Sequence, residues 1–212
     1  MFIRLLMLTA LLWAPAAWAA KPAILVLGDS LSAGYGVATG KGWVALLDER
    51  LQRDHYDYRV VNASISGDTT RSGIARLPAA LADYRPHIVI IALGGNDGLQ
   101  GLTLPQMRAN LARAIEDARH AGAKVVLAGV RLPPNYGPAY NQRFRAVFQQ
   151  LAQHYRPAYV PQLLAGVDDK PALMQADGIH PNEAGQPLIL DNLWPHLTPL
   201  LQGTGATVRH PR

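Results

Sequence analysis

The chain has 212 residues, a formal net charge of +5 and no cysteine. The lack of cysteine excludes disulfide bonds, cysteine nucleophiles and cysteine-ligated metals, so the hydrophobic core must stabilise the fold. Basic residues are scattered rather than gathered into a run, which gives no indication of a nucleic-acid-binding surface. The mild positive charge favours an anionic lipid surface only weakly, so we expect at most peripheral membrane contact.

The first 19 residues have the pattern of a secretory signal peptide. Arg4 precedes an apolar run that ends at Ala20, and Ala17-Trp18-Ala19 has the small-x-small form of a cleavage site. The run is shorter than the about 20 apolar residues of a membrane-spanning helix, and Pro15 interrupts it. The sequence therefore predicts cleavage after Ala19 and export of the remaining chain.

Short apolar runs alternate with segments of helical spacing along the rest of the chain. Runs rich in Leu, Ile and Val predict five strands, at residues 24–27, 58–62, 87–93, 124–130 and 158–161. Apolar residues spaced three and four apart predict helices at residues 43–53, 68–81, 105–121, 140–154 and 182–194. Glycine and proline mark loops at residues 34–42, 94–98 and 132–138.

This alternation contains no internal repeat and no linker. It predicts one three-layer α/β/α domain over residues 20–202, with a mostly parallel five-stranded sheet. Residues 203–212 are predicted to be a loose tail.

The first predicted strand ends at Gly28, and Ser30 follows it. Open parallel sheets bind ligands beyond the carboxyl ends of their strands, so this hydroxyl is a candidate nucleophile. A serine needs a base to take its proton, and His180 is the candidate because histidine accepts protons near neutral pH. Asp177 is the candidate group that orients the imidazole, since it precedes His180 by three residues and Gly178 permits the bend.

Charge that develops on an acyl oxygen needs preorganised donors. The candidates are the backbone N–H groups of Ser30 and Gly67 and the side-chain amide of Asn96, because all three follow predicted strands. Gly67 suits this role since no side chain blocks the approach of a substrate to its N–H group.

Each of these residues also has a purely structural interpretation. Ser30 could cap a helix, Gly67 could serve a turn, Asn96 could bond to its own main chain, and His180 could lie on the surface. We favour the catalytic interpretation because the topology brings all of them to one edge of one sheet.

Four short blocks, in order, resemble the blocks of the SGNH, or GDSL-type, hydrolases. The blocks are Gly28-Asp29-Ser30-Leu31, Gly67, Gly94-Gly95-Asn96-Asp97 and Asp177-Gly178-Ile179-His180. The resemblance implies a flavodoxin-like sheet, a triad of Ser30, Asp177 and His180, and oxyanion donors at Ser30, Gly67 and Asn96. It also implies a periplasmic location, no metal and no other cofactor. The implied substrates are acyl esters and thioesters, including aryl esters, acyl-CoA and lysophospholipids.

The expected reaction is acyl transfer to water through an acyl-enzyme. Thioesters and aryl esters suit it because thiols and phenols, with pKa values near ~8.5 and ~10, leave readily. Loops 98–103 and 132–137 are the expected walls of an apolar groove, with Leu99 and Tyr136 as candidate substrate contacts. We expect a monomer. The alternatives are a carbohydrate acetylesterase of the same family and a non-catalytic lipid-binding protein of the cell envelope.

Overall fold

The structure, a computed structural model, describes residues 21–201. The predicted signal peptide at residues 1–19 and the predicted tail at residues 203–212 lie outside this range. None of the helices within residues 21–201 has the length and apolar character needed to cross a membrane.

Five parallel strands form one sheet in the order β2-β1-β3-β4-β5. The strands are β1 (Ala23–Gly28), β2 (Arg59–Asn62), β3 (Ile88–Ala92), β4 (Lys124–Ala128) and β5 (Ala158–Val160). Strands β1 and β3 are buried along their whole length, as their apolar runs predict. Their register pairs Ile24 with Ile88 and Gly28 with Ala92, so the two strands end side by side. The predicted α/β/α architecture is confirmed.

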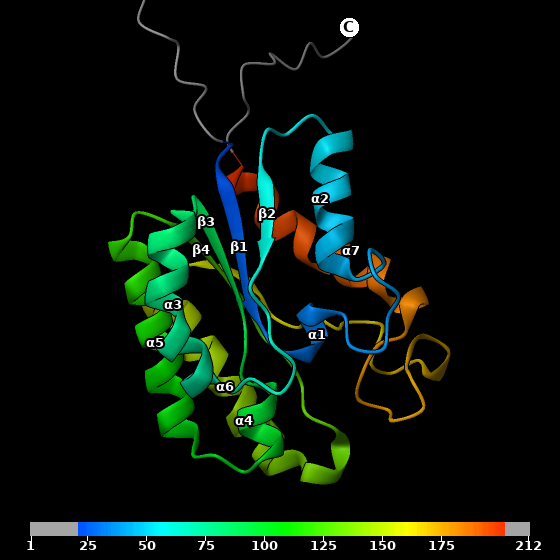
Figure 1. The fold of residues 1–212 in the computed structure, drawn as a ribbon. Helices are drawn as coiled ribbons and strands as arrows, with labels where there is room; N and C mark the ends of the chain where they lie inside the picture. The colour runs from blue at the N-terminus through cyan, green and yellow to red at the C-terminus, as the bar shows by residue number, and fades with distance from the viewer. Residues whose placement is uncertain (1–20, 202–212) are drawn as a thin grey trace, which may run out of the picture.

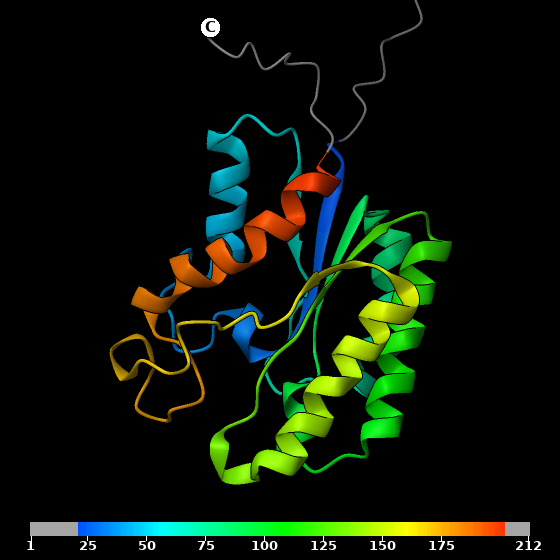
Figure 2. The same ribbon diagram turned by 180° about the vertical axis from the view of Figure 1, so that it is seen from behind.

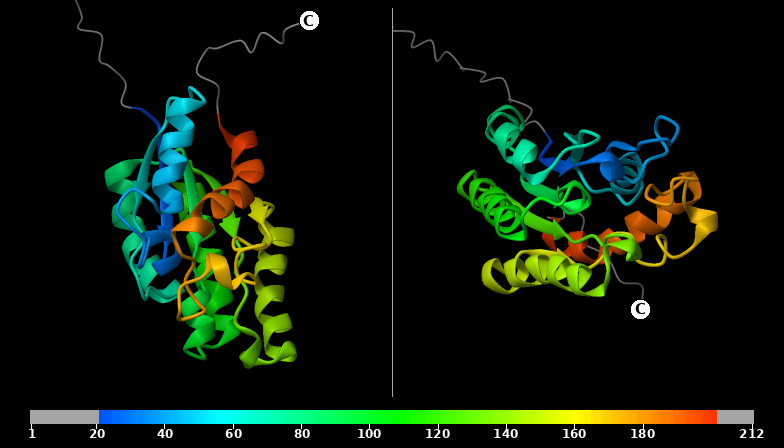
Figure 3. Two further views of the ribbon diagram at one scale, coloured as in Figure 1. Left: turned by 90° about the vertical axis from the view of Figure 1, so that its right-hand side faces the viewer. Right: turned by 90° about the horizontal axis from the view of Figure 1, so that it is seen from below.

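Helices cover both faces of the sheet (Figures 1 and 3). Helices α3 (Thr70–Tyr84), α5 (Leu104–His120) and α6 (Pro138–Tyr155) pack side by side on one face. Helices α2 (Trp43–Arg53) and α7 (Gln186–Leu197) pack together on the other. Figure 2 shows the yellow β5 between α7 and α6.

This arrangement follows from the strand order. The chain moves from β1 outward to β2, then returns past β1 to β3, and right-handed crossovers in opposite directions place their helices on opposite faces. The change of direction lies between β1 and β3, which is where open sheets of this order bind ligands. In Figure 1 these strands run downward, and Figure 3 shows their carboxyl ends from below.

Short helical turns occupy the loops beyond these strand ends. They are α1 (Ser30–Ala33), α4 (Gly95–Leu99) and the 3-10 turns η1 (Pro134–Tyr136), η2 (Pro171–Leu173) and η3 (Glu183–Gly185). The 3-10 turn η4 (Thr198–Leu200) follows α7 and lies at the opposite end of the sheet, where the Leu200 carbonyl accepts from Lys124 at the start of β4. Trp43 ties α1 to the domain, because its Nε1–H donates to the Leu31 carbonyl at 3.0 Å while its backbone N–H donates to Gln186 Oε1 at 3.0 Å. The turn that carries Ser30 is therefore held from behind by a buried side chain.

The prediction of a loop at residues 94–98 was wrong, because α4 forms there. Three glycines in five residues disfavour a helix by local propensity. Packing overrides that preference: a Cβ on Gly98 would lie 2.7 Å from Leu132, so only glycine lets this helix approach. The buried carboxylate of Asp97 also accepts hydrogen bonds from the N–H and Oγ1 of Thr70, at 2.8 and 2.5 Å, which anchors α4 to α3.

Other differences are shifts of element ends. Helix α3 extends to Tyr84 instead of Leu81, α6 begins at Pro138 instead of Tyr140, and α7 extends to Leu197 instead of Trp194. The last helix was predicted to begin at residue 182; the structure has η3 there, with the side chain of Asn182 accepting from the N–H of Gly185, and α7 follows.

Candidate active site

Ser30 is the first residue of α1, directly beyond the end of β1. The alternative in which Ser30 caps this helix is wrong, because the cap is Asp29, whose Oδ1 accepts from the N–H of Leu31 at 3.1 Å. The hydroxyl of Ser30 is therefore not engaged in capping and points to another partner.

That partner is His180. Its Nε2 lies 2.9 Å from Ser30 Oγ, and its Nδ1 lies 2.7 Å from Asp177 Oδ2. The alternative in which His180 is a surface residue does not hold, since its side chain is 18% exposed and bonded at both nitrogens. The three side chains form a hydrogen-bonded chain in which the histidine bridges the carboxylate and the hydroxyl.

Asp177 is held by its own turn. Its Oδ1 accepts from the N–H groups of Ile179 and His180, at 2.9 and 3.0 Å, while Gly178 takes a left-handed φ of +65° that permits the bend. The backbone N–H of His180 is the largest cause that lowers the pKa of Asp177 to about 2, and the imidazole is the next. A carboxylate that stays ionised favours a proton on Nδ1, which leaves Nε2 free to accept from Ser30.

The residues predicted as oxyanion donors lie on neighbouring loops. Gly67 has a φ of +86°, and apart from its two chain neighbours no residue has a heavy atom within 4 Å of where its Cβ would be. Asn96, in α4, donates from Nδ2 to the Asp68 carbonyl at 2.8 Å and not to its own main chain. A primary amide has two N–H groups, so the second remains for a ligand.

A cavity of about 170 Å³ lies beside Ser30. Its lining combines Ser30, Asn96 and His180 with apolar side chains from four separate segments, namely Leu31, Leu99, Val130, Leu132, Leu164, Met174 and Ile179. Gly67 is not among the lining residues; its neighbour Asp68 is hydrogen-bonded to Asn96, which does line the cavity. The cavity offers an apolar space within reach of the serine hydroxyl.

The two predicted substrate contacts differ in position. Leu99 lines the cavity, whereas Tyr136 does not and instead donates its hydroxyl to the Leu99 carbonyl at 3.0 Å. Tyr136 thus supports the wall that Leu99 forms. Within residues 21–201, no group of three or more His, Asp or Glu side chains is arranged to hold a metal ion.

The residues of this site lie within the part of the chain that matches a known protein family. Residues 26–188 match the model of the GDSL-like Lipase/Acylhydrolase family. The chain belongs to this family. The predicted family and the predicted class of enzyme, an ester hydrolase, are therefore confirmed.

Three named relatives align with most of this chain. Esterase TesA of Pseudomonas aeruginosa is 55% identical over 183 residues, which are 86% of this chain and 91% of that protein. The Escherichia coli K12 protein "Thioesterase 1/protease 1/lysophospholipase L1" is 44% identical over 183 residues, 86% of each chain. The arylesterase of Vibrio mimicus is 43% identical over 189 residues, 89% of this chain and 94% of that protein.

Solved structures agree with the fold. The crystal structure of TesA has a TM-score of 0.83 at 55% identity and covers 84% of this chain and 99% of that one. The esterase EstA of Pseudoalteromonas sp., solved with monoethylphosphonate as inhibitor, has a TM-score of 0.80 at 37% identity, with coverages of 84% and 98%.

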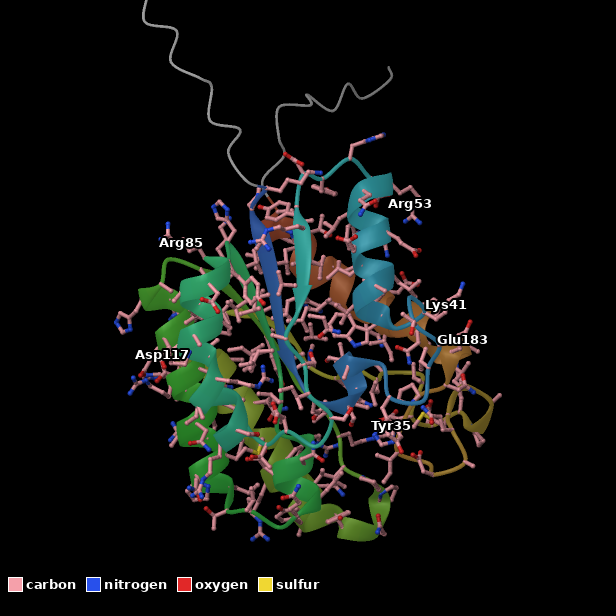
Figure 4. All side chains as sticks on the ribbon, in the orientation of Figure 1. Tyr35, Lys41, Arg53, Arg85, Asp117 and Glu183 are labelled. Carbon is pink, nitrogen blue, oxygen red and sulfur yellow. The ribbon has the colours of Figure 1, made fainter. Side chains whose placement is uncertain are left out.

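Sequence reasoning missed two groups that brace the histidine of this family member. The ring of Tyr35 lies against the imidazole of His180, with 4.6 Å between ring centroids, and Figure 4 shows Tyr35 beside the segment that precedes α7. The amide of Gln175 donates to the carbonyls of Tyr35 and Pro181, at 2.8 and 3.0 Å. Gln175 and Tyr35 are 140 residues apart, so no local pattern could reveal the contact.

Asp29 is the third group that the sequence did not reveal. The side chain is buried next to Ser30 and lines the cavity. Burial, which disfavours the charged form, raises its pKa to about 6. Its position is set by the bond to Leu31 that caps α1.

Proposed function

We propose that this family member hydrolyses carboxylic esters and thioesters by transferring the acyl group to Ser30 and then to water. The 2.9 Å distance between His180 Nε2 and Ser30 Oγ is the observation that carries the proposal. A base within hydrogen-bond reach can take the hydroxyl proton as the oxygen attacks the acyl carbonyl.

The other groups take the roles expected from the resemblance. Asp177 holds the imidazole and stabilises the positive charge that forms on it. The N–H groups of Ser30 and Gly67 and the amide of Asn96 bind the negative oxygen of the tetrahedral intermediate. His180 then protonates the departing alcohol or thiol, and afterwards activates the water that releases the acid from Ser30.

Thioesters and aryl esters are the proposed preferred substrates. Their leaving groups have low pKa values and need little protonation to depart. The names of the relatives include thioesterase, lysophospholipase and arylesterase, in agreement with this range. The cavity lining is mostly apolar, which supports an acyl chain as its occupant rather than the sugar of a carbohydrate acetylesterase.

The decisive experiment is Ser30→Ala, assayed with p-nitrophenyl butyrate. We expect kcat to fall by at least ~1,000-fold, because loss of the nucleophile removes the covalent route. Circular dichroism should be unchanged, since the substitution removes one atom. The wild type should react with a fluorophosphonate probe and Ser30→Ala should not. A variant that retains its activity would refute the assignment of Ser30 as nucleophile.

We also propose that the protein is exported to the periplasm and acts as a monomer. The signal-peptide pattern of residues 1–19 supports export, and N-terminal sequencing of the exported protein should start at Ala20. Light scattering of the purified protein, which measures its molar mass in solution, tests whether it is a monomer.

A further inference from the structure

Arg76 binds three residues from two chain segments near the candidate oxyanion donors, namely the end of β1 and the loop between β2 and α3. It lies on α3, and its Nε and Nη2 contact Asp68 Oδ2 at 2.8 and 2.6 Å. Its Nη2 also donates to the Gly28 carbonyl at 3.3 Å, and its Nη1 donates to the Ala63 carbonyl. The Arg76 and Asp68 side chains are 23% and 11% exposed, so water screens this ion pair weakly.

Both segments lead to proposed oxyanion donors. Gly28 is the last residue of β1 and lies two positions before Ser30. Asp68 directly follows Gly67, and its backbone carbonyl accepts the amide of Asn96 at 2.8 Å. One guanidinium is therefore connected to Gly67 and Asn96 through Asp68, and to Ser30 through Gly28 and Asp29.

Two backbone bonds also hold the loop that carries Gly67: Ile65 N–H donates to the Gly28 carbonyl, and Asp68 N–H to the Ile65 carbonyl, each at 3.1 Å. Residues 65–67 are exposed, and no atom outside the loop lies near the Cβ position of Gly67. Asp68 is the buried residue of this stretch, at 9% exposure. The position of the Gly67 N–H group thus depends on where Asp68 is held.

We propose that the Arg76–Asp68 ion pair is a positioning pair that sets the oxyanion donors around Ser30. The proposal rests on the proposed function of those donors. Neither side chain lines the cavity, so the pair acts through Gly67, Asn96 and the end of β1 and does not touch the substrate.

Arginine suits this position and lysine does not. A guanidinium directs five N–H groups in a fixed plane, which matches an acceptor set made of one carboxylate and two carbonyls. A lysine ammonium on a flexible stem keeps the charge near Asp68 but cannot hold all three acceptors in the same geometry. Arg76→Lys should therefore restore the ion pair with Asp68 more fully than it restores the positions of the oxyanion donors.

The test measures kcat and KM of Arg76→Gln and Arg76→Lys with p-nitrophenyl butyrate. We expect Arg76→Gln to lower kcat by ~10- to 100-fold with KM changed less than ~3-fold, because a displaced donor costs less than the ~100- to 1,000-fold of a deleted one. Arg76→Lys should fall between Arg76→Gln and the wild type. The rate of fluorophosphonate labelling should fall in parallel with kcat.

Arg50→Gln is the matched control. The Arg50 side chain is also 23% exposed, pairs with Asp191 at 2.8 Å and links α2 to α7, and neither residue lines the cavity. We expect it to lower the melting temperature as Arg76→Gln does, but to keep kcat within ~2-fold of the wild type. If Arg76→Gln also keeps kcat within ~2-fold, or loses no more than Arg50→Gln, the inference is overturned.

Asp68→Asn keeps the inference testable if Arg76→Gln does not fold. It preserves size and one acceptor oxygen for Arg76, and we expect kcat to fall by ~5- to 30-fold at little change in KM. A folded Asp68→Asn with wild-type kcat would overturn the inference. The proposed function fails in a different way, namely if Ser30→Ala is active. If Ser30→Ala is inactive while the Arg76 and Asp68 variants keep the wild-type kcat, only the positioning role is refuted.

Discussion

Asp29 precedes the proposed nucleophile, Ser30, and Asp177 is hydrogen-bonded to the proposed base, His180. The pKa values of these two aspartates differ. Burial raises the pKa of Asp29 to about 6, whereas hydrogen bonds from the backbone and side chain of His180 lower the pKa of Asp177 to about 2. Asp29 accepts one backbone N–H group and is 3% exposed, while Asp177 accepts two backbone N–H groups and lies at the surface. Asp177 therefore stays charged above about pH 4, whereas Asp29 changes its charge near pH 6.

The first prediction concerns Asp29 and pH. Its folded pKa of about 6 lies above the unfolded value of 3.8, so its contribution to stability is complete below about pH 4 and is lost as pH rises through 6. A difference of about two pH units corresponds to ~3 kcal/mol. Asp29→Asn keeps an acceptor for Leu31 and carries no charge, so it should not show this loss.

Urea unfolding of both proteins at about pH 4, 5.5 and 7 measures the effect. The free energy of unfolding of Asp29→Asn minus that of the wild type should rise by up to ~3 kcal/mol across this range. A difference that is constant with pH would show that Asp29 does not titrate there. Titrating groups that do not interact with Asp29 cancel in the subtraction, whereas His180 and Asp68, whose charges act on Asp29, contribute to the measured difference.

At the scale of elements, the junction of β1 and α1 leaves no room for a side chain at Gly28. A Cβ there would lie 2.6 Å from Ser32 Oγ and 2.9 Å from Ser64 Oγ, and Ser32 is itself buried at 2% exposure. The turn that presents Ser30 is thus pressed against the strand end, and the glycine is a packing requirement.

The second prediction is that Gly28→Ala destabilises the fold and displaces the nucleophile. Overpacking should cost ~1–3 kcal/mol in the free energy of unfolding, and kcat should fall because α1 must shift. Gly42→Ala is the control: the nearest atom to its Cβ is Gly34 Cα at 3.5 Å, an ordinary contact, and its φ is −70°. We expect it to cost less than ~1 kcal/mol and to leave kcat unchanged. Equal effects of the two variants would contradict the packing explanation.

At the scale of the whole molecule, the cavity exists only because distant loops meet. Leu31 follows β1, Leu99 follows β3, Leu132 follows β4, and Leu164 follows β5. The carboxyl ends of four parallel strands therefore supply the walls, and the width of the cavity depends on their spacing across the sheet.

The third prediction concerns acyl-chain length. Leu99→Trp should lower kcat/KM for p-nitrophenyl octanoate by ~10-fold relative to p-nitrophenyl acetate, because the ring displaces about two methylenes at ~0.8 kcal/mol each. Leu102→Trp is the control, since Leu102 lies in the same loop, is 36% exposed and does not line the cavity. The same shift of preference in both variants would rule out Leu99 as an acyl contact.

The sequence by itself determined the five strands, the five long helices and the local part of the site. The apolar runs of β1 and β3 are buried on both faces and therefore have a strong pattern. Asp177 and His180 lie three residues apart, so a single turn brings them together. Information of this kind is local, and the residues that carry it are close in the chain.

Only the tertiary structure decided which side chains support that site. Arg76, Gln175 and Tyr35 act across long sequence separations, and α4 forms against its own helix propensity because Leu132 and Thr70 pack and bond with it. The raised pKa of Asp29 likewise comes from burial, which depends on the elements packed around it. Burial and contact between distant segments are properties of the packed chain, and no short pattern of residues encodes them.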